Sequence, residues 1–195
     1  GGHVWAGVPA IAAAQIMNYY QFPATGRDSA NVMIDIDGDH RWGINFEYAH
    51  YDYDGLDWDS NAGETPTFGE IQDAGYLIYH AGIAIGLNYY CYNWYMTNWS
   101  DGVYEAFNNH FYYNATTWID IDAAQQQEHF PDILINELDN GRPILYKGQV
   151  ELVEGSEEET NFWTVDGYQD INNTVTFHIT WGYGGNNDGY FTLGD

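Results

Sequence analysis

Apolar positions recur at helical spacing in four segments, and the expected helices cover residues 9–20, 70–81, 101–108 and 131–138. The first segment has small residues at four of five consecutive positions after Pro9, which indicates a buried helix with closely packed neighbours. Thr67-Phe68-Gly69-Glu70 has the form of a capping box that opens the second helix. Ser100 is the expected N-cap of the third helix, and Asp139-Asn140-Gly141 is expected to end the fourth.

Short runs of β-branched and aromatic residues predict the strands. Two of them follow the first helix, over residues 32–36 and 44–46, and one follows the second helix, over residues 82–87. The last third of the chain is expected to be strands only, over residues 143–147, 162–167, 175–181 and 190–193. Because most helices come first and antiparallel strands follow, the pattern predicts an α+β fold, in which the buried N-terminal helix packs against a C-terminal antiparallel sheet.

The charge balance narrows the classes of partner. Four Lys and Arg residues stand against 29 Asp and Glu residues, a net charge of −25. This charge repels phosphate backbones and anionic membranes, so we expect no nucleic-acid partner. No run of about 18 apolar residues predicts a membrane span. The length of 195 residues suits a single domain over residues 1–195, and we expect it to lack the extreme N- and C-terminal segments of the protein.

Metal and cofactor chemistry has little support in the sequence. Cys91 is the only cysteine, so neither an internal disulfide nor a thiolate metal cluster is expected. Asp35, Asp37 and Asp39 have the spacing of a calcium loop, but His40 stands at the sixth position, where such loops have glycine. Ordinary Asp-Gly turns explain these carboxylates as well. We therefore predict no cofactor and no metal, with the three aspartates as partial calcium candidates.

Five stretches, in order along the chain, form a longer signature. They are Ala12-Ala13-Ala14-Gln15-Ile16-Met17, Asp57-Trp58-Asp59, residues 135–146 with their Gly-Arg-Pro, Val165-Asp166-Gly167, and residues 177–191 with their Trp-Gly-Tyr-Gly-Gly. Together they resemble the streptopain family, which are secreted, papain-like cysteine peptidases of bacteria. The resemblance implies a papain-like fold and an extracellular location.

The same resemblance implies that the catalytic positions are substituted. Counted from the matched motifs, the family's nucleophilic Cys falls on Val8 and its general-base His falls on Asn161. The Asn that orients the imidazole falls on Thr180, and Trp181, which flanks the site in the family, is retained. Peptide cleavage by this route needs a thiolate and an imidazole, and Val8 and Asn161 supply neither. His3 and His178 could lie near the cleft, but without a nucleophile they are only polar cleft residues.

The sequence is consistent with three different functions. The first is an inactive streptopain-like homologue, a secreted pseudoenzyme retained for binding a protein or peptide or for extracellular assembly. The second is an active cysteine endopeptidase, if the residues at positions 8 and 161 are mutated or misread. The third is a structural subunit of an extracellular fibre, which self-associates through the aromatic stretch at residues 89–94. His80 is expected to be a packed or capping histidine in each case.

Overall fold

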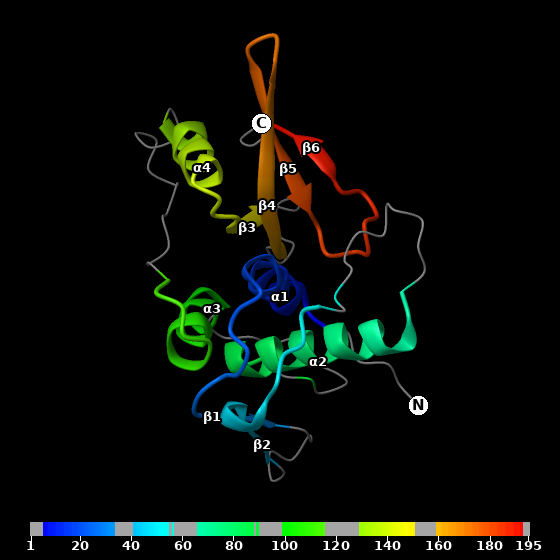
Figure 1. Cartoon of the computed structure of the whole chain (residues 1–195). Helices are drawn as coiled ribbons and strands as arrows, with labels where there is room; N and C mark the ends of the chain where they lie inside the picture. The colour runs from blue at the N-terminus through cyan, green and yellow to red at the C-terminus, as the bar shows by residue number, and fades with distance from the viewer. Residues whose placement is uncertain are drawn as a thin grey trace. The chain divides into compact units, whose positions relative to one another are not determined.

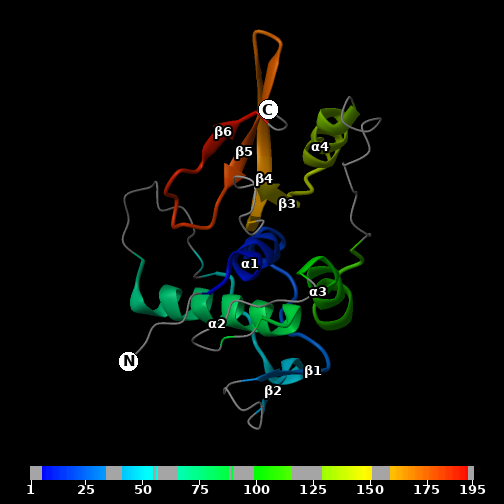
Figure 2. The ribbon, with the colours of Figure 1, turned by 180° about the vertical axis from the view of Figure 1, so that it is seen from behind.

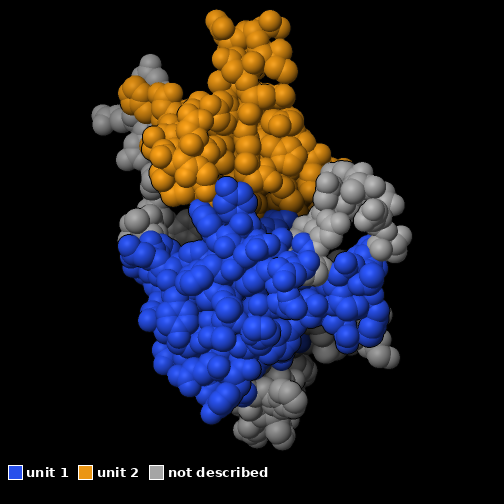
Figure 3. Space-filling model, viewed as in Figure 1, with its two compact units in different colours: residues 1–117 blue, residues 118–195 orange. Residues whose placement is uncertain are grey.

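The computed structural model describes residues 6–33, 41–54, 56, 66–87, 89, 99–115, 129–150 and 159–192. The chain divides into two compact units, residues 1–117 and residues 118–195, which Figure 3 shows in different colours. The first unit contains helices and a two-stranded sheet, and the second contains one helix and a four-stranded antiparallel sheet among the described residues (Figure 1). This architecture confirms the predicted α+β class. That a single domain spans residues 1–195 stays a prediction.

Helix α1 (Val8–Tyr20) is the buried helix that the small-residue run predicts. Four of its buried residues are alanines (Ala10, Ala12, Ala13 and Ala14), and these small side chains let helix α2 (Phe68–Ile85) pack directly against it. The helix ends at Gln21, which adopts the left-handed conformation and donates its N–H to the Asn18 carbonyl over 3.0 Å. Figure 2 shows α1 crossing α2 within the first unit.

Helix α2 corrects one sequence prediction. The capping box forms as expected, with the Glu70 N–H donating to Thr67 Oγ1 over 3.3 Å. The predicted strand over residues 82–87 is wrong, because the helix continues through Ile85 and stops at Gly86, whose φ is 85°. A short, wholly apolar run fits a buried helix and a buried strand equally well, so its pattern alone does not separate the two.

The third helix is longer than expected. Helix α3 (Trp99–Glu105) continues directly into the π-helical turn η3 (Ala106–His110). Ser100 therefore lies inside the helix and is not its N-cap, which corrects that prediction.

A small hairpin completes the first unit. Strand β1 (Ser29–Met33) pairs with β2 (Arg41–Asn45) in antiparallel register. Each strand begins three residues before its predicted start, so both strands are predicted but their bounds are wrong. The second of these strands ends before Phe46, which is fully buried and begins the 3-10 turn η1 (Phe46–Tyr48).

The second unit is a sheet with one helix against it. Helix α4 (Phe130–Asp139) ends at Asn140, and Gly141 follows with φ 68°, as the sequence predicts. The strands follow the order β3 (Ile144–Val150), β4 (Glu159–Ile171), β5 (Thr174–Thr180) and β6 (Gly189–Phe191), all antiparallel (Figure 1). The core between helix and sheet consists of Phe130, Leu134, Trp163, Val165, Phe177 and Ile179.

Strand β4 extends past its predicted end at Gly167. The register with β5 shifts between Val165 and Gly167, so Asp166-Gly167 forms a bulge inside the strand and does not end it. The strand continues to Ile171 and turns at Asn172 and Asn173, both in the left-handed conformation.

Several predicted features lie outside the described residues. These are His3, the calcium candidates Asp35, Asp37 and Asp39, the stretch Asp57-Trp58-Asp59, Cys91, and the aromatic stretch apart from Tyr89. Within the described part of the chain, no helix has the length and apolar character needed to cross a membrane.

Candidate functional site

Val8 is the first residue of α1 and is half-buried. The Gly7 carbonyl starts the helix by accepting hydrogen bonds from the N–H groups of Ala10 (3.1 Å) and Ile11 (3.2 Å). A helix N-terminus carries partial positive charge and stabilises an anion such as a thiolate. The isopropyl group of Val8 has no lone pair and no acidic proton, so it cannot use this environment for nucleophilic chemistry.

The backbone that leads into Val8 contacts residues in the last turns of α2 and directly after it. The Tyr89 hydroxyl donates to the Ala6 carbonyl over 3.2 Å, and burial raises the pKa of Tyr89, so the donor stays protonated. A Cβ on Gly82 would lie 1.8 Å from this hydroxyl oxygen, so only glycine leaves room for the Tyr89 ring. Gly7 has φ 82°, and a Cβ there would lie 2.8 Å from Leu87 Cδ1. These contacts therefore hold the backbone of Ala6 and Gly7, directly before α1.

Asn161 lies in β4, opposite Gly148 of β3. Its side-chain oxygen accepts a hydrogen bond from the Phe162 N–H over 3.0 Å. Alternate residues of a strand share a face, so Asn161 lies on the same face as Trp163. A Cβ on Gly148 would lie 2.1 Å from the Trp163 indole, so this glycine provides the space that the ring occupies.

Trp181 belongs to a row of aromatic rings. Its ring centroid lies 4.9 Å from Trp163 and 5.7 Å from Phe191, and Trp163 stacks on Tyr146 at 4.9 Å. The backbone N–H of Trp181 also donates to Asp188 Oδ1 over 2.9 Å, which closes the turn that follows β5. Sequence reasoning singled out Trp181 but missed Tyr146 and Trp163, although the alternation of Asn161 with Trp163 along one strand was a usable signal.

Thr180 and His178 converge on a carboxylate that the sequence identified only as part of a motif. Asp166 Oδ1 lies 2.6 Å from His178 Nδ1, and Asp166 Oδ2 accepts a hydrogen bond from the Thr180 hydroxyl at 3.4 Å. A carboxylate on Nδ1 orients an imidazole for proton transfer. Among the described residues, the Thr180 hydroxyl bonds the carboxylate and no hydroxyl or thiol bonds the imidazole. The group is therefore an oriented acid–histidine pair without a nucleophile.

Asn161, Thr180 and Trp181 all belong to the second unit, in which Asn161 lies in β4 and Thr180 lies at the end of the neighbouring strand β5. Val8 belongs to the first unit. No group of three His, Cys, Asp or Glu side chains in the described ranges could hold a metal ion.

Comparison with known proteins identifies the family. The model of the Peptidase C10 family matches residues 1–191. The chain belongs to the Peptidase C10 family. This confirms the predicted relationship to the streptopain group of peptidases.

Solved structures confirm the papain-like fold. The chain is similar to active wild-type interpain A, a cysteine protease of Prevotella intermedia, with a TM-score of 0.80 and 25% identity over 98% of this chain and 76% of that one. It is also similar to a fragment of prointerpain A from the same organism that carries a cysteine-to-alanine mutation. That comparison has a TM-score of 0.76 and 23% identity over 98% of this chain and 57% of the fragment. No curated protein sequence matches the chain.

Proposed function

We propose that this chain is a secreted member of the Peptidase C10 family without peptidase activity, retained for binding a protein or peptide or for extracellular assembly. The observation that carries the proposal is Val8 at the start of the buried helix α1. Counted back from Gln15-Ile16-Met17, this is the position at which we expect the family's nucleophile. Removing a nucleophile from such an enzyme costs several orders of magnitude in rate, so the remaining scaffold would have binding as its main capacity.

The partner positions support the same proposal. Asn161 has no group that titrates near neutral pH, and its side-chain oxygen already accepts the Phe162 N–H. Thr180, at the position of the family's orienting Asn, has its hydroxyl on Asp166. Three substitutions that each remove a catalytic function are more consistent with a lost activity than with a modified one.

Incubation of the purified chain with casein, with and without a thiol-directed active-site probe, tests the proposal. We expect no cleavage in either case. Because Cys91 is the only thiol in the sequence, the variant C91A serves as a matched control. Cleavage that the probe blocks in the wild-type chain would overturn the proposal, and its loss in C91A would identify Cys91 as the nucleophile.

An active cysteine endopeptidase is the second candidate function. It is favoured by membership of the Peptidase C10 family and by the likeness to an active interpain A. It requires Cys at position 8 and His at position 161 in the natural gene. A sequencing read of the gene, or the intact mass of the natural protein, decides between the two candidates.

Exposed apolar side chains on α2 support the proposed role in extracellular assembly, in which copies of the chain would associate. Large apolar side chains are exposed on α2, among them Phe68 and Ile71. Exposed apolar residues on one helix face are typical of contact surfaces. Sedimentation velocity across a wide concentration range is the measurement, and a monomer throughout would exclude a fibre subunit.

A further inference from the structure

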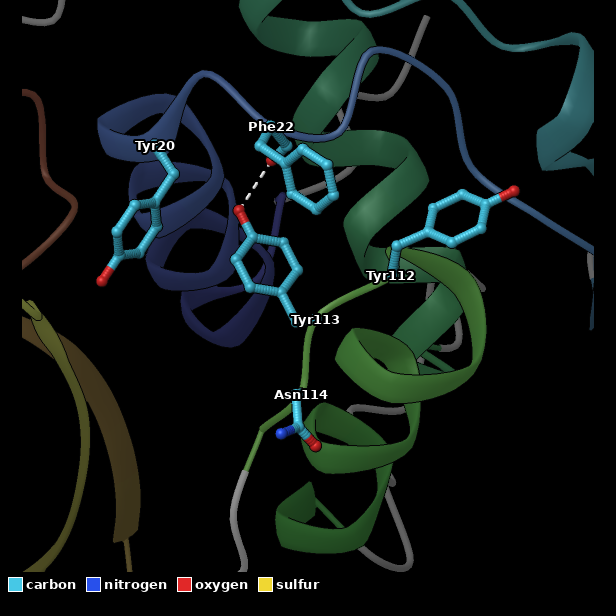
Figure 4. A pocket seen from close by; sticks show the side chains of 5 residues that line it. All are labelled: Tyr20, Phe22, Tyr112, Tyr113 and Asn114. Atoms are coloured by element: carbon cyan, nitrogen blue, oxygen red, sulfur yellow. Dashed lines mark hydrogen bonds between the residues drawn. The ribbon is translucent and has the colours of Figure 1, made fainter.

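A pocket of about 410 Å³ opens in the first unit, between the end of α1 and the segment after η3 (Figure 4). Its lining residues are Tyr20, Phe22, Tyr112, Tyr113 and Asn114. It is an open surface depression and not an enclosed cavity, so a ligand bound here would lie along the surface. None of the lining residues belongs to the candidate catalytic positions, so a loss of peptidase activity does not account for this pocket.

Hydrogen bonds and a ring contact hold Tyr113 and the segment that follows it. The Tyr113 hydroxyl donates to the Phe22 carbonyl over 2.6 Å, and the Tyr113 ring packs edge-on against Phe107 at 4.9 Å. Asn108 holds the next segment with two hydrogen bonds, from the Ala115 N–H (3.1 Å) and to the Ala115 carbonyl (3.3 Å). A ligand that binds here therefore has little ordering of the protein to overcome.

Tyr112 is held in place against its backbone preference. Its φ is 60°, a left-handed conformation that is unfavourable for a bulky residue. The Arg27 guanidinium lies 5.0 Å from the Tyr112 ring centroid and donates from Nε to the Asn109 carbonyl over 2.7 Å. These contacts fix a ring that remains 48% exposed. Strain of this kind is found where a side chain is positioned for binding.

The rings form corners and not a flat platform. Phe22 and Tyr113 meet at 74° with centroids 5.4 Å apart, and Tyr20 and Tyr113 meet at 60° with centroids 6.1 Å apart. Figure 4 shows Tyr113 between Tyr20 and Phe22, with Tyr112 beyond Phe22. Small saturated rings fit such corners, because each contacts two aromatic faces at once.

The charges in and around the pocket favour one class of ligand over others. The lining contains no carboxylate and no cation, and the neighbouring Arg27 is engaged by carbonyl groups and by Tyr112. The net charge of −25 repels acidic ligands and attracts basic flanking groups. The pocket therefore suits an uncharged segment whose flanks are basic.

We propose that this pocket binds a proline-rich peptide segment in the polyproline II conformation. Pyrrolidine rings fit the aromatic corners, and this helix leaves its backbone carbonyls free to accept hydrogen bonds. Asn114 and the Tyr112 hydroxyl are suitable donors, and neither has a hydrogen-bond partner among the described residues. A saccharide fits less well, because its many hydroxyl groups need more polar partners than Asn114 and the tyrosine hydroxyls of the lining provide.

Fluorescence polarisation with a labelled peptide of eight prolines preceded by two lysines tests the proposal. The control peptide keeps the lysines and replaces the prolines by alternating Gly and Ser. We expect the proline peptide to bind at least about tenfold more tightly than the control peptide. The variant Y112N removes the ring, and Asn tolerates the left-handed backbone; it should weaken binding by about fivefold or more.

The matched control is Y48N, because Tyr48 is 85% exposed and lies outside the pocket. We expect this variant to bind within about twofold of wild type, with both variants folded by circular dichroism. Equal binding of the two peptides would mean charge attraction only and would overturn the proposal. The proposal also fails if the proline peptide does not saturate, if Y112N binds as wild type does, or if cellotriose binds in its place and depends on Tyr112.

Discussion

His80 is a buried polar residue of α2, in the packed environment that the sequence predicts. It is 5% exposed, its Nδ1 lies 3.0 Å from the Tyr51 hydroxyl, and its ring centroid lies 4.1 Å from that of Tyr76. Burial lowers the pKa of His80 from 6.5 to about 4. The imidazole is therefore neutral in the folded chain at pH values where it would already be protonated in the unfolded chain.

This difference predicts a loss of stability in acid. Between pH 6.5 and about 4 the unfolded chain binds the proton more readily, so the free energy of unfolding falls as the pH falls through this window. The variant H80Q keeps a polar group for Tyr51 but cannot titrate. Urea unfolding at pH 7.5 and 4.5 should show wild type losing about 2–3 kcal/mol more than H80Q. Parallel pH profiles for the two proteins would contradict the role of His80.

Gly82 of α2 shows how one element positions another. The Tyr89 ring occupies the space beside Gly82 and holds the Ala6 carbonyl, next to the start of α1. The variant G82A should displace this ring and destabilise the first unit by about 1–3 kcal/mol, although alanine favours helices. Thermal unfolding measures the loss. Gly75, where a Cβ would meet nothing within 4 Å, is the control, and G75A should be neutral or stabilising.

The features that the sequence predicts correctly depend on neighbouring residues along the chain. The capping box at Thr67, the Asn140-Gly141 ending and the closing strands are local signals, and the structure confirms them. The end of α2 was misassigned because a buried apolar run has no polar face to reveal its period. The bulge at Asp166-Gly167 was missed because it depends on the register with β5. The Asp166–His178 pair was missed for the same reason.

At the scale of the whole molecule, repulsion within the net charge of −25 destabilises the compact folded state. Salt screens repulsion between surface carboxylates, so the free energy of unfolding should rise by about 1 kcal/mol or more as NaCl increases from 20 to 500 mM. Urea unfolding at fixed pH measures this change. The variant E154Q/E157Q/E158Q removes three negative charges and should show a smaller salt effect; an effect equal to that of wild type would contradict the explanation.

The proposed assignment of the catalytic positions leads to a prediction about the whole chain. If Val8 and Asn161 occupy the positions of nucleophile and base, then restoring both residues should restore chemistry that neither restores alone. We therefore expect V8C/N161H, made in a C91A background, to cleave casein slowly and to lose that activity to a thiol-directed probe. Because we expect the family's imidazole-orienting Asn at position 180, addition of T180N should raise the rate further.

The single variants are the controls for this experiment. V8C alone should react with the probe, because the N-terminus of α1 stabilises a thiolate, but it should not cleave casein without a base. N161H alone should do neither. A double variant that is folded and labelled yet inactive would mean that the substitutions extend beyond these positions. A folded double variant whose new thiol at position 8 is not labelled would refute the assignment of Val8, and with it the proposal that the chain has no peptidase activity.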